Sequence, residues 1–262
     1  MTSNRLLFLF IGIILLTPFK FCIASELIEV NSRDDVLQRG LFIEAEDATH
    51  TVLLFPGGGG WVKLKDDGKL RKMKGNFVVR TRDMLIDAGM NVVVVDSPTD
   101  YYSPWGMNGG FRSSNEHMLD ISALITEIKK ISSKPIWLSG TSRGSESVAY
   151  AGIHVKGISG IILTSSITEN NEKGREVTSY DLDKITVPVF IGAHEGDECW
   201  VTPPEGAAEI RSKITNAKAI EYKIYSGGDE PISGACKAKS EHGFYGIEHK
   251  VLSDMINFIK KH

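Results

Sequence analysis

The sequence has 262 residues, with 30 Lys and Arg against 33 Asp and Glu, a formal charge of −3, and 42% hydrophobic residues. This composition is that of a globular protein, and its charge argues against a partner such as nucleic acid or an anionic membrane surface. The length suits one large domain, and no repeat, low-complexity tract or Pro/Gly-rich linker divides the chain.

The first 24 residues have the layout of a secretory signal peptide. Arg5 supplies the positive charge, residues 6–16 are an unbroken apolar run, and Ala24 ends a short stretch of small residues. The run is short for a bilayer span, and a proline and a lysine interrupt its extension. These interruptions favour cleavage after Ala24 over an uncleaved membrane anchor. We therefore expect a periplasmic or secreted domain, residues 25–262, with no stable membrane insertion.

Apolar runs and turn residues alternate along the expected mature chain. The expected strands are 41–43 and 51–55, as an opening pair, then 91–95, 135–138, 158–164, 187–191 and 219–225. The expected helices are 77–88, 115–131 with Asn115 as N-cap, 143–151, 203–214 and 245–261. This alternation predicts an α/β fold, a three-layer sandwich in which helices flank a mainly parallel central sheet.

The pentapeptide Gly140-Thr141-Ser142-Arg143-Gly144 lies between an expected strand and an expected helix. Strand, sharp turn and helix with Ser between two glycines is the pattern of a nucleophile elbow. Such a turn holds the serine in a strained backbone conformation, and glycines avoid collisions with the neighbouring strand and helix. Ser142 is therefore the candidate nucleophile.

A glycine run follows the 51–55 strand, at residues 57–60. Glycines let backbone N–H groups approach a substrate closely, which suits the binding of an oxyanion. We expect the donors to be Gly58 and Gly59 together with the backbone N–H of Arg143, immediately after the nucleophile. The alternative is a flexible loop that merely requires glycine.

Candidates for the acid and the base follow the last two expected strands, where the carboxyl ends of parallel strands form a site. Asp197 is the preferred acid because it follows a glycine just past the strand end, and Glu195 and Glu198 are rivals. His242 is the preferred base because it lies between the last strand and the last helix. His194 is the second choice.

Two of the three cysteines remain after signal cleavage, namely Cys199 and Cys236. An even pair in an exported protein indicates a disulfide, and two buried free thiols are the alternative. Cys199 lies two residues after Asp197, and Cys236 lies six before His242. The bond would therefore tie the acid loop to the histidine loop, and we hypothesise that it pre-organises the acid–base pair.

The order Ser142, Asp197, His242 on three such loops resembles the α/β-hydrolase superfamily, and the resemblance covers essentially the whole mature chain. It implies attack by the serine on an acyl carbonyl, with the histidine as base. The sequence departs from the superfamily pattern at two positions. Pro56 stands before the glycines where many members have His, and Arg143 stands after the nucleophile where a small or apolar residue is commoner. Residues 75–77 and 80–82, with the elbow, are similar to a subgroup of exported hydrolases.

The long loop 97–114 and the residue after the glycine run are rich in aromatic side chains. We expect a pocket wall to include Trp61, Tyr101, Trp105 and Arg112, which would suit an apolar or ring-bearing group. The alternative is that these side chains only pack the loop onto the sheet.

The predicted function is hydrolysis of a carboxylic ester or related acyl bond in a small to medium soluble substrate. The alternatives are an acyltransferase with the same triad and a non-catalytic binding protein on a hydrolase scaffold. No His, Asp or Cys cluster has the spacing of a metal site, so we expect neither metal nor cofactor. The sequence does not predict an oligomeric state.

Overall fold

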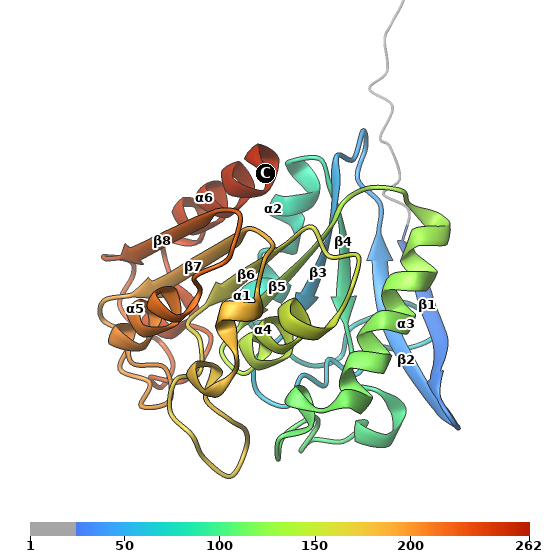
Figure 1. Ribbon diagram of the computed structural model, residues 1–262, viewed down its shortest axis with the longest axis horizontal. Coiled ribbons are helices and arrows are strands. Elements are labelled where there is room, and N and C mark those ends of the chain that lie inside the picture. The colour runs from blue at the N-terminus through green and yellow to red at the C-terminus, as the bar shows by residue number, and fades with distance from the viewer. Residues whose placement is uncertain (1–24) are drawn as a thin grey trace, which may run out of the picture.

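The computed structural model describes residues 25–262; the predicted signal peptide and its cleavage point lie outside the described residues. One mixed sheet of eight strands runs through this part of the chain (Figure 1). The strands are β1 (Ser25–Arg33), β2 (Val36–Ile43), β3 (His50–Phe55), β4 (Met90–Val95), β5 (Ile136–Thr141), β6 (Gly160–Thr164), β7 (Val189–His194) and β8 (Ile220–Tyr225). Their order in the sheet is β1-β2-β4-β3-β5-β6-β7-β8, with β3 to β8 parallel and the first two strands joined to them antiparallel.

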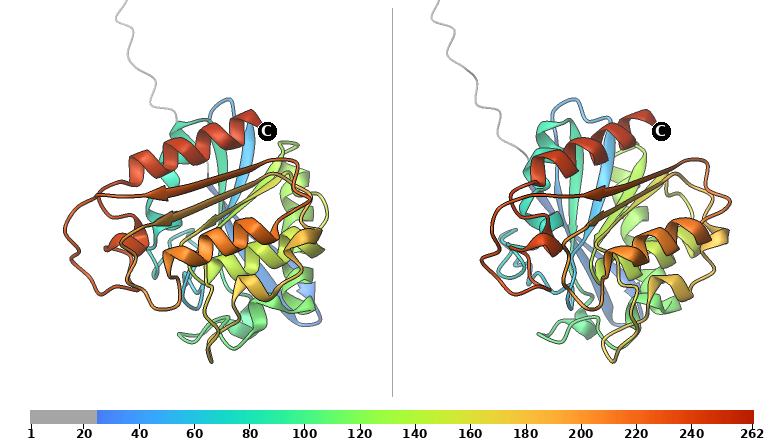
Figure 2. Two further views of the ribbon diagram at one scale, coloured as in Figure 1. Left: turned by 60° about the vertical axis from the view of Figure 1, so that its left-hand side comes forward. Right: turned by 90° about the vertical axis from the view of Figure 1, so that its left-hand side faces the viewer.

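Helices cover both faces of the sheet, which confirms the predicted three-layer α/β architecture. The helices are α1 (Phe77–Arg80), α2 (Arg82–Asp87), α3 (Asn115–Ile131), α4 (Gly144–His154), α5 (Pro204–Lys213) and α6 (Glu248–Lys261). Single 3-10 turns lie at Thr99–Tyr101, Phe111–Ser113, Val177–Ser179, Leu182–Lys184 and Glu241–Gly243. Figure 2 shows α6 on one face of the sheet, and α4 and α5 on the other. Among residues 25–262, no helix is long and apolar enough to cross a membrane.

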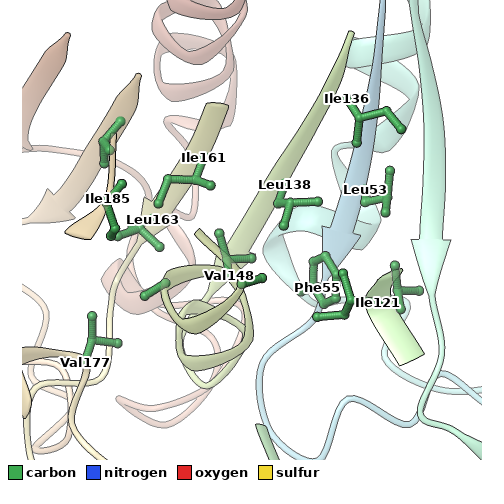
Figure 3. Close-up of a cluster of buried hydrophobic side chains, with 14 of the residues drawn as sticks. Leu53, Phe55, Ile121, Ile136, Leu138, Val148, Ile161, Leu163, Val177 and Ile185 are labelled. Carbon is green, nitrogen blue, oxygen red and sulfur yellow. The ribbon is translucent and has the colours of Figure 1, made fainter. Parts of the chain in front are cut away.

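The core consists of one apolar layer on each face of the sheet. Successive side chains of a strand point to opposite faces, so Leu53 joins one layer and Val52 the other. In the layer of Figure 3, Leu53 and Leu138 from the sheet lie with Ile121 of α3 and Val148 of α4. Burial on both faces explains why the central strands are continuous apolar runs rather than alternating ones.

One strand was not expected, and two expectations about the elements were wrong in detail. Strand β1 was not predicted; it lies at the sheet edge and buries only Ile28, so its sequence lacks a clear apolar pattern. The 41–43 and 51–55 strands do not pair, because β4 lies between them. The predicted N-cap of α3 is off by one residue, since the Ser114 hydroxyl accepts a hydrogen bond from the backbone N–H of His117.

The expected helix 77–88 is two short helices that break at Thr81. The Thr81 hydroxyl donates a hydrogen bond of 2.7 Å to the carbonyl of Phe77. The residue has φ −95° and ψ 1°, outside the helical region, and α2 begins at the next residue. A threonine hydroxyl can bond to a backbone carbonyl one turn earlier in the helix and disturb the helix there. The spacing of apolar residues does not reveal such a break.

The two ends of the described chain lie at the same edge of the sheet. Ser25 pairs with Ile43, which in turn pairs with Val92 near the start of β4. At the other end of the chain, α6 brings Lys260 close to His50, the first residue of β3. The charge of Lys260 contributes, after burial, to lowering the pKa of His50. Figure 1 shows the C-terminus at this edge. The loops at the carboxyl ends of the parallel strands therefore lie at the opposite edge.

Candidate active site

Ser142 occupies a sharp turn between β5 and α4, as the pentapeptide pattern predicts. Its φ is +52°, in the left-handed region that L-residues rarely adopt. A β-carbon on Gly144 would lie 1.9 Å from the carbonyl oxygen of Phe55, and one on Gly140 would lie 2.4 Å from the carbonyl oxygen of Gly144. The strand and helix therefore approach each other closely enough to require both glycines, and the turn projects the serine from the strand end.

Asp197 and His242 form a hydrogen-bonded pair at the ends of β7 and β8. Nδ1 of His242 lies 2.9 Å from Oδ2 of Asp197, and both residues are buried. The other carboxylate oxygen of Asp197 accepts a bond of 2.9 Å from the backbone N–H of Cys199. The pair fixes the imidazole with its Nδ1 toward the acid, and Nε2 has no hydrogen-bond partner among the described residues.

Thr202 is a third member of this group that the sequence did not reveal. Its hydroxyl lies 3.0 Å from Oδ2 of Asp197 and 3.0 Å from Nδ1 of His242, and the residue is buried. As a donor to the carboxylate, it fills the remaining acceptor position of the oxygen that faces the histidine. A threonine five residues after the acid carries no pattern that marks this role.

Ser142 and His242 line the same pocket, of about 380 Å³. One wall is the loop before α1, with Met73, Lys74, Gly75, Asn76 and Phe77, and the other is the loop after β8, with Cys236, Lys237 and Ala238. Among the described residues, Ser142 Oγ has no hydrogen-bond partner, whereas its backbone N–H donates to the carbonyl of Thr164. The hydroxyl is therefore free to meet a ligand in the pocket.

The carbonyls of residues 56–59, at the glycine turn, all have hydrogen-bond partners within the protein. Those of Pro56 and Gly58 accept from Arg112, that of Gly57 from the N–H of Gly60, and that of Gly59 from an N–H of the 97–114 loop. Because C=O and N–H point in opposite directions across a trans peptide, residues 57–59 direct their N–H groups away from those partners. A β-carbon on Gly57 would lie 2.9 Å from Cβ of Ser142, so this turn packs directly against the serine.

The turn brings only part of the expected oxyanion donors to the pocket. Gly58 lines it, and the backbone N–H of Arg143 makes no hydrogen bond to a described residue. Gly59 instead packs against the 97–114 loop, where a β-carbon would lie 2.6 Å from the carbonyl oxygen of Trp105. Gly57, which was not singled out, lines the pocket in its place.

Arg112 holds the glycine turn by hydrogen bonds to its carbonyls and does not line the pocket. It is completely buried, and its guanidinium donates to Pro56 and Gly58 and to the hydroxyl of Ser147. Burial lowers its pKa to about 10, so the group remains charged at neutral pH. Its expected contact with substrate does not fit this position, because the chain around it excludes any ligand. Nearby His117, whose Nε2 lies 3.0 Å from the same hydroxyl, has a pKa lowered by burial to about 3.

The side chain of Arg143 faces an internal carboxylate. It binds Glu146 at 3.0 Å, one turn along α4, and the side-chain oxygen of Asn171 at 2.5 Å. Burial raises the pKa of Glu146 to about 7, against the opposing effect of Arg112 and Arg143. The Arg143 side chain thus anchors the 165–176 loop to α4, while its backbone N–H stays beside Ser142.

The predicted disulfide is confirmed. Cys199 and Cys236 are bonded, and the bond joins the loop that carries Asp197 to the loop that precedes His242. Cys199 is buried, and Cys236 lines the pocket. Asp197, Cys199 and His242 also offer atoms within 4.8 Å of one another, but the Cys199 sulfur is already bonded and the other two bind each other.

The expected aromatic residues lie outside the pocket that holds Ser142. Trp61 lines a neighbouring hollow of about 220 Å³ and packs edge-on against Tyr102. Tyr101 stacks on Phe111, and Trp105 is 51% exposed. These contacts match the alternative that the side chains pack the loop. The pocket is lined instead by residues 73–77, of which 75–77 belong to the pattern similar to that of exported hydrolases, and by the loop after β8, which carries no distinctive motif.

The rival candidates for acid and base lie elsewhere. Glu195 and Glu198 are exposed, unlike Asp197. His194 donates from Nε2 to the carbonyl of Gly227 at 2.7 Å and accepts at Nδ1 from Gly196, so both ring nitrogens already have backbone partners. It lines a separate surface hollow.

No known family and no curated protein matches the sequence. Solved structures do match in fold. An esterase from Pyrococcus furiosus is 16% identical, with 91% of this chain and 90% of its own covered and a TM-score of 0.66. The α/β hydrolase GrgF from Penicillium sp. sh18 is 11% identical, over 92% and 99% of the two chains, with a TM-score of 0.67. An acylaminoacyl peptidase from Pyrococcus horikoshii is 12% identical, over 91% of this chain and 42% of its own, with a TM-score of 0.64. At these identities the likeness is one of fold, and the chain has the α/β-hydrolase fold.

Proposed function

We propose that the protein is a serine hydrolase that cleaves a carboxylic ester, or a related acyl bond, of a small to medium soluble substrate. The observation that carries the proposal is the meeting of Ser142 on a strained turn with the Asp197–His242 pair in one pocket. Similar solved structures include proteins described as esterases, which supports this choice of chemistry.

In the proposed mechanism, Ser142 attacks the acyl carbonyl while Nε2 of His242 takes its proton. Asp197 holds the imidazole in the required tautomer and stabilises the imidazolium that forms. The backbone N–H groups of Arg143 and of the glycine turn bind the oxyanion, each contributing about 3 kcal/mol to the barrier reduction in comparable sites. The histidine then returns the proton to the leaving alcohol, and water releases the acyl group from the serine.

A panel of short acyl esters, amides and lactones, combined with a fluorophosphonate probe, tests this proposal. We expect hydrolysis of at least one ester class and covalent labelling of Ser142, because the probe reacts with an activated serine hydroxyl. Product ratios with and without added alcohols separate hydrolysis from acyl transfer. If the folded protein neither labels nor hydrolyses any member of the panel, the serine-nucleophile mechanism is wrong.

The replacement Arg112→Met is expected to lower kcat about 10-fold while leaving KM nearly unchanged. The two turn carbonyls lose their donors, so the oxyanion N–H groups are held less firmly, and these act mainly in the transition state. The buried unpaired carbonyls also lower the free energy of unfolding by about 3 kcal/mol. Steady-state kinetics and thermal unfolding measure both effects.

The matched variant Arg112→Lys keeps the charge but loses the planar fork of donors, so we expect an intermediate kcat. A folded Arg112→Met protein with wild-type kcat would show that the guanidinium only stabilises the fold.

Export of the protein is part of the same proposal. The disulfide between Cys199 and Cys236 supports it, because structural disulfides persist mainly in oxidising compartments. N-terminal sequencing of the protein purified from its native location tests the expected cleavage, with Ser25 as the first residue. An N-terminus at Met1 on the exported protein would contradict the cleavage.

A further inference from the structure

The lysine, arginine and acidic residues that line the Ser142 pocket reduce to two lysines. Lys74 belongs to the wall formed by the loop before α1, and Lys237 to the wall formed by the loop after β8. Among the described residues, no Asp or Glu lines the pocket. Two chain segments far apart in sequence thus each bring a cation to the site of the proposed chemistry.

Neither lysine is neutralised by the protein. Both side chains are exposed, and neither forms an ion pair with a described residue, whereas nearby Lys69 pairs with Asp67 at 3.0 Å. Each ammonium group therefore keeps its full charge and its three donors for a ligand.

Lys74 also lines a second hollow, of about 600 Å³, beside the first. The other basic residues that line this hollow form ion pairs: Lys69 and Arg71 with Asp67, Arg80 with Glu248, and Arg82 with Asp83. Among the described residues, Lys74 is therefore the lysine of this hollow whose charge is left for a ligand.

The positive charge of Lys74 and Lys237 at the pocket does not follow from the overall charge of the chain. The whole chain has a formal charge of −3, and residues 1–24 contain two basic residues and no acid, so the described domain is more negative still. A cation-lined cleft on an acidic molecule concentrates the positive potential at the pocket. Charge of one sign within a cleft focuses the field and raises the rate at which oppositely charged ligands arrive.

We propose that the substrate of this pocket is an anionic ester, one that carries a carboxylate or a similar acidic group close to the scissile bond. This deepens the proposed function and rests on it. Lys74 and Lys237 act as specificity-determining residues: their ammonium groups bind the acidic group while Ser142 reaches the acyl carbonyl. The volume of about 380 Å³ suits a small substrate with such a group.

Matched pairs of esters that differ by one charge test the proposal. For an anion on the acyl side, the pair is the mono-p-nitrophenyl ester of adipic acid and p-nitrophenyl hexanoate. For an anion on the alcohol side, the pair is 4-acetoxybenzoate and 4-acetoxybenzamide. Within one pair the enzyme should prefer the anionic member by at least about 10-fold in kcat/KM, corrected for spontaneous hydrolysis, with the difference mainly in KM. The pair that shows the preference tells which half of the substrate carries the acidic group.

The variants Lys74→Gln and Lys237→Gln locate the effect. Each should lower the ratio of kcat/KM for the anionic and neutral esters several-fold, and the double variant should bring it close to one. Raising the salt concentration should also lower the wild-type ratio, because exposed charges are screened. The control Lys134→Gln removes an equal charge just before β5, at the opposite edge of the sheet, and should leave the ratio as in wild type.

Three failures are distinguishable. If neutral esters are hydrolysed as well as anionic ones in both pairs, the proposed substrate class is wrong while the proposed hydrolase stands. If a preference exists but persists in the double lysine variant, these two residues do not cause it and the inference is overturned. If the folded protein hydrolyses none of the four esters and does not label with fluorophosphonate, the proposed function fails, and the substrate class fails with it.

Discussion

Replacing Ser142 with alanine is expected to lower kcat/KM for ester hydrolysis by about 10⁴- to 10⁶-fold, because the nucleophile of the proposed mechanism is lost while the binding pocket remains. The fold should change little. Alanine keeps the β-carbon at a position with φ +52°, and the serine hydroxyl makes no hydrogen bond to a described residue that the change would remove. Steady-state kinetics and thermal unfolding of the two proteins measure the expected result.

A matched serine elsewhere provides the control. Ser212 lies near the end of α5 and is exposed. Its hydroxyl donates a hydrogen bond to the backbone carbonyl of Glu209. Ser212→Ala should keep both the activity and the labelling by fluorophosphonate, whereas Ser142→Ala should lose both. Residual activity of Ser142→Ala within about 10-fold of wild type would assign the nucleophile to another group.

Removing the disulfide with Cys199→Ser/Cys236→Ser is expected to lower the free energy of unfolding by about 4 kcal/mol, because the bond closes a long loop of the unfolded chain. The bonded residues are separated by 37 positions. For a domain of this size the loss corresponds to a fall in Tm of about 10 °C. Thermal unfolding under non-reducing conditions compares the variant with the oxidised wild-type protein.

The same variant also tests the positioning of the acid and the base. The backbone N–H of Cys199 donates to Asp197, and Cys236 borders the pocket, so the bond holds both loops in place around His242. We expect kcat to fall several-fold at temperatures where the variant is fully folded. Cys199→Ala/Cys236→Ala controls for the added hydroxyl groups. Unchanged kcat in both folded variants would leave the disulfide with a stabilising role only.

The features that short sequence patterns predicted are those fixed by local chemistry. The central strands are buried on both faces, so their apolar runs stand out, and the strand–turn–helix pattern around Ser142 is local in sequence, although the contact that requires Gly144 is with Phe55 on β3. The order of strands then places the loops of Asp197 and His242 at the same edge of the sheet as the serine. Edge strand β1, with one buried side chain, has no such pattern.

The features that were missed depend on how distant loops fold over the sheet. Arg112 was expected in the pocket, but its loop turns it inward to the carbonyls of Pro56 and Gly58. The actual pocket wall, with Lys74 and Lys237, comes from two loops whose sequences give no sign that they meet. The sequence around a charged residue does not differ between a solvated surface and a binding pocket. Only the tertiary structure distinguishes the two locations.

The location of the C-terminus has a practical consequence. The C-terminus lies at the edge of the sheet opposite the loops that carry Ser142 and His242 (Figure 1). Ser25, by contrast, lines the hollow that shares Lys74 with the Ser142 pocket. A tether, an affinity tag or a fusion partner joined at the C-terminus would therefore leave the mouth of the pocket open. Immobilised on a surface through this end, the protein would present its proposed active site outward, toward substrate in the surrounding solution.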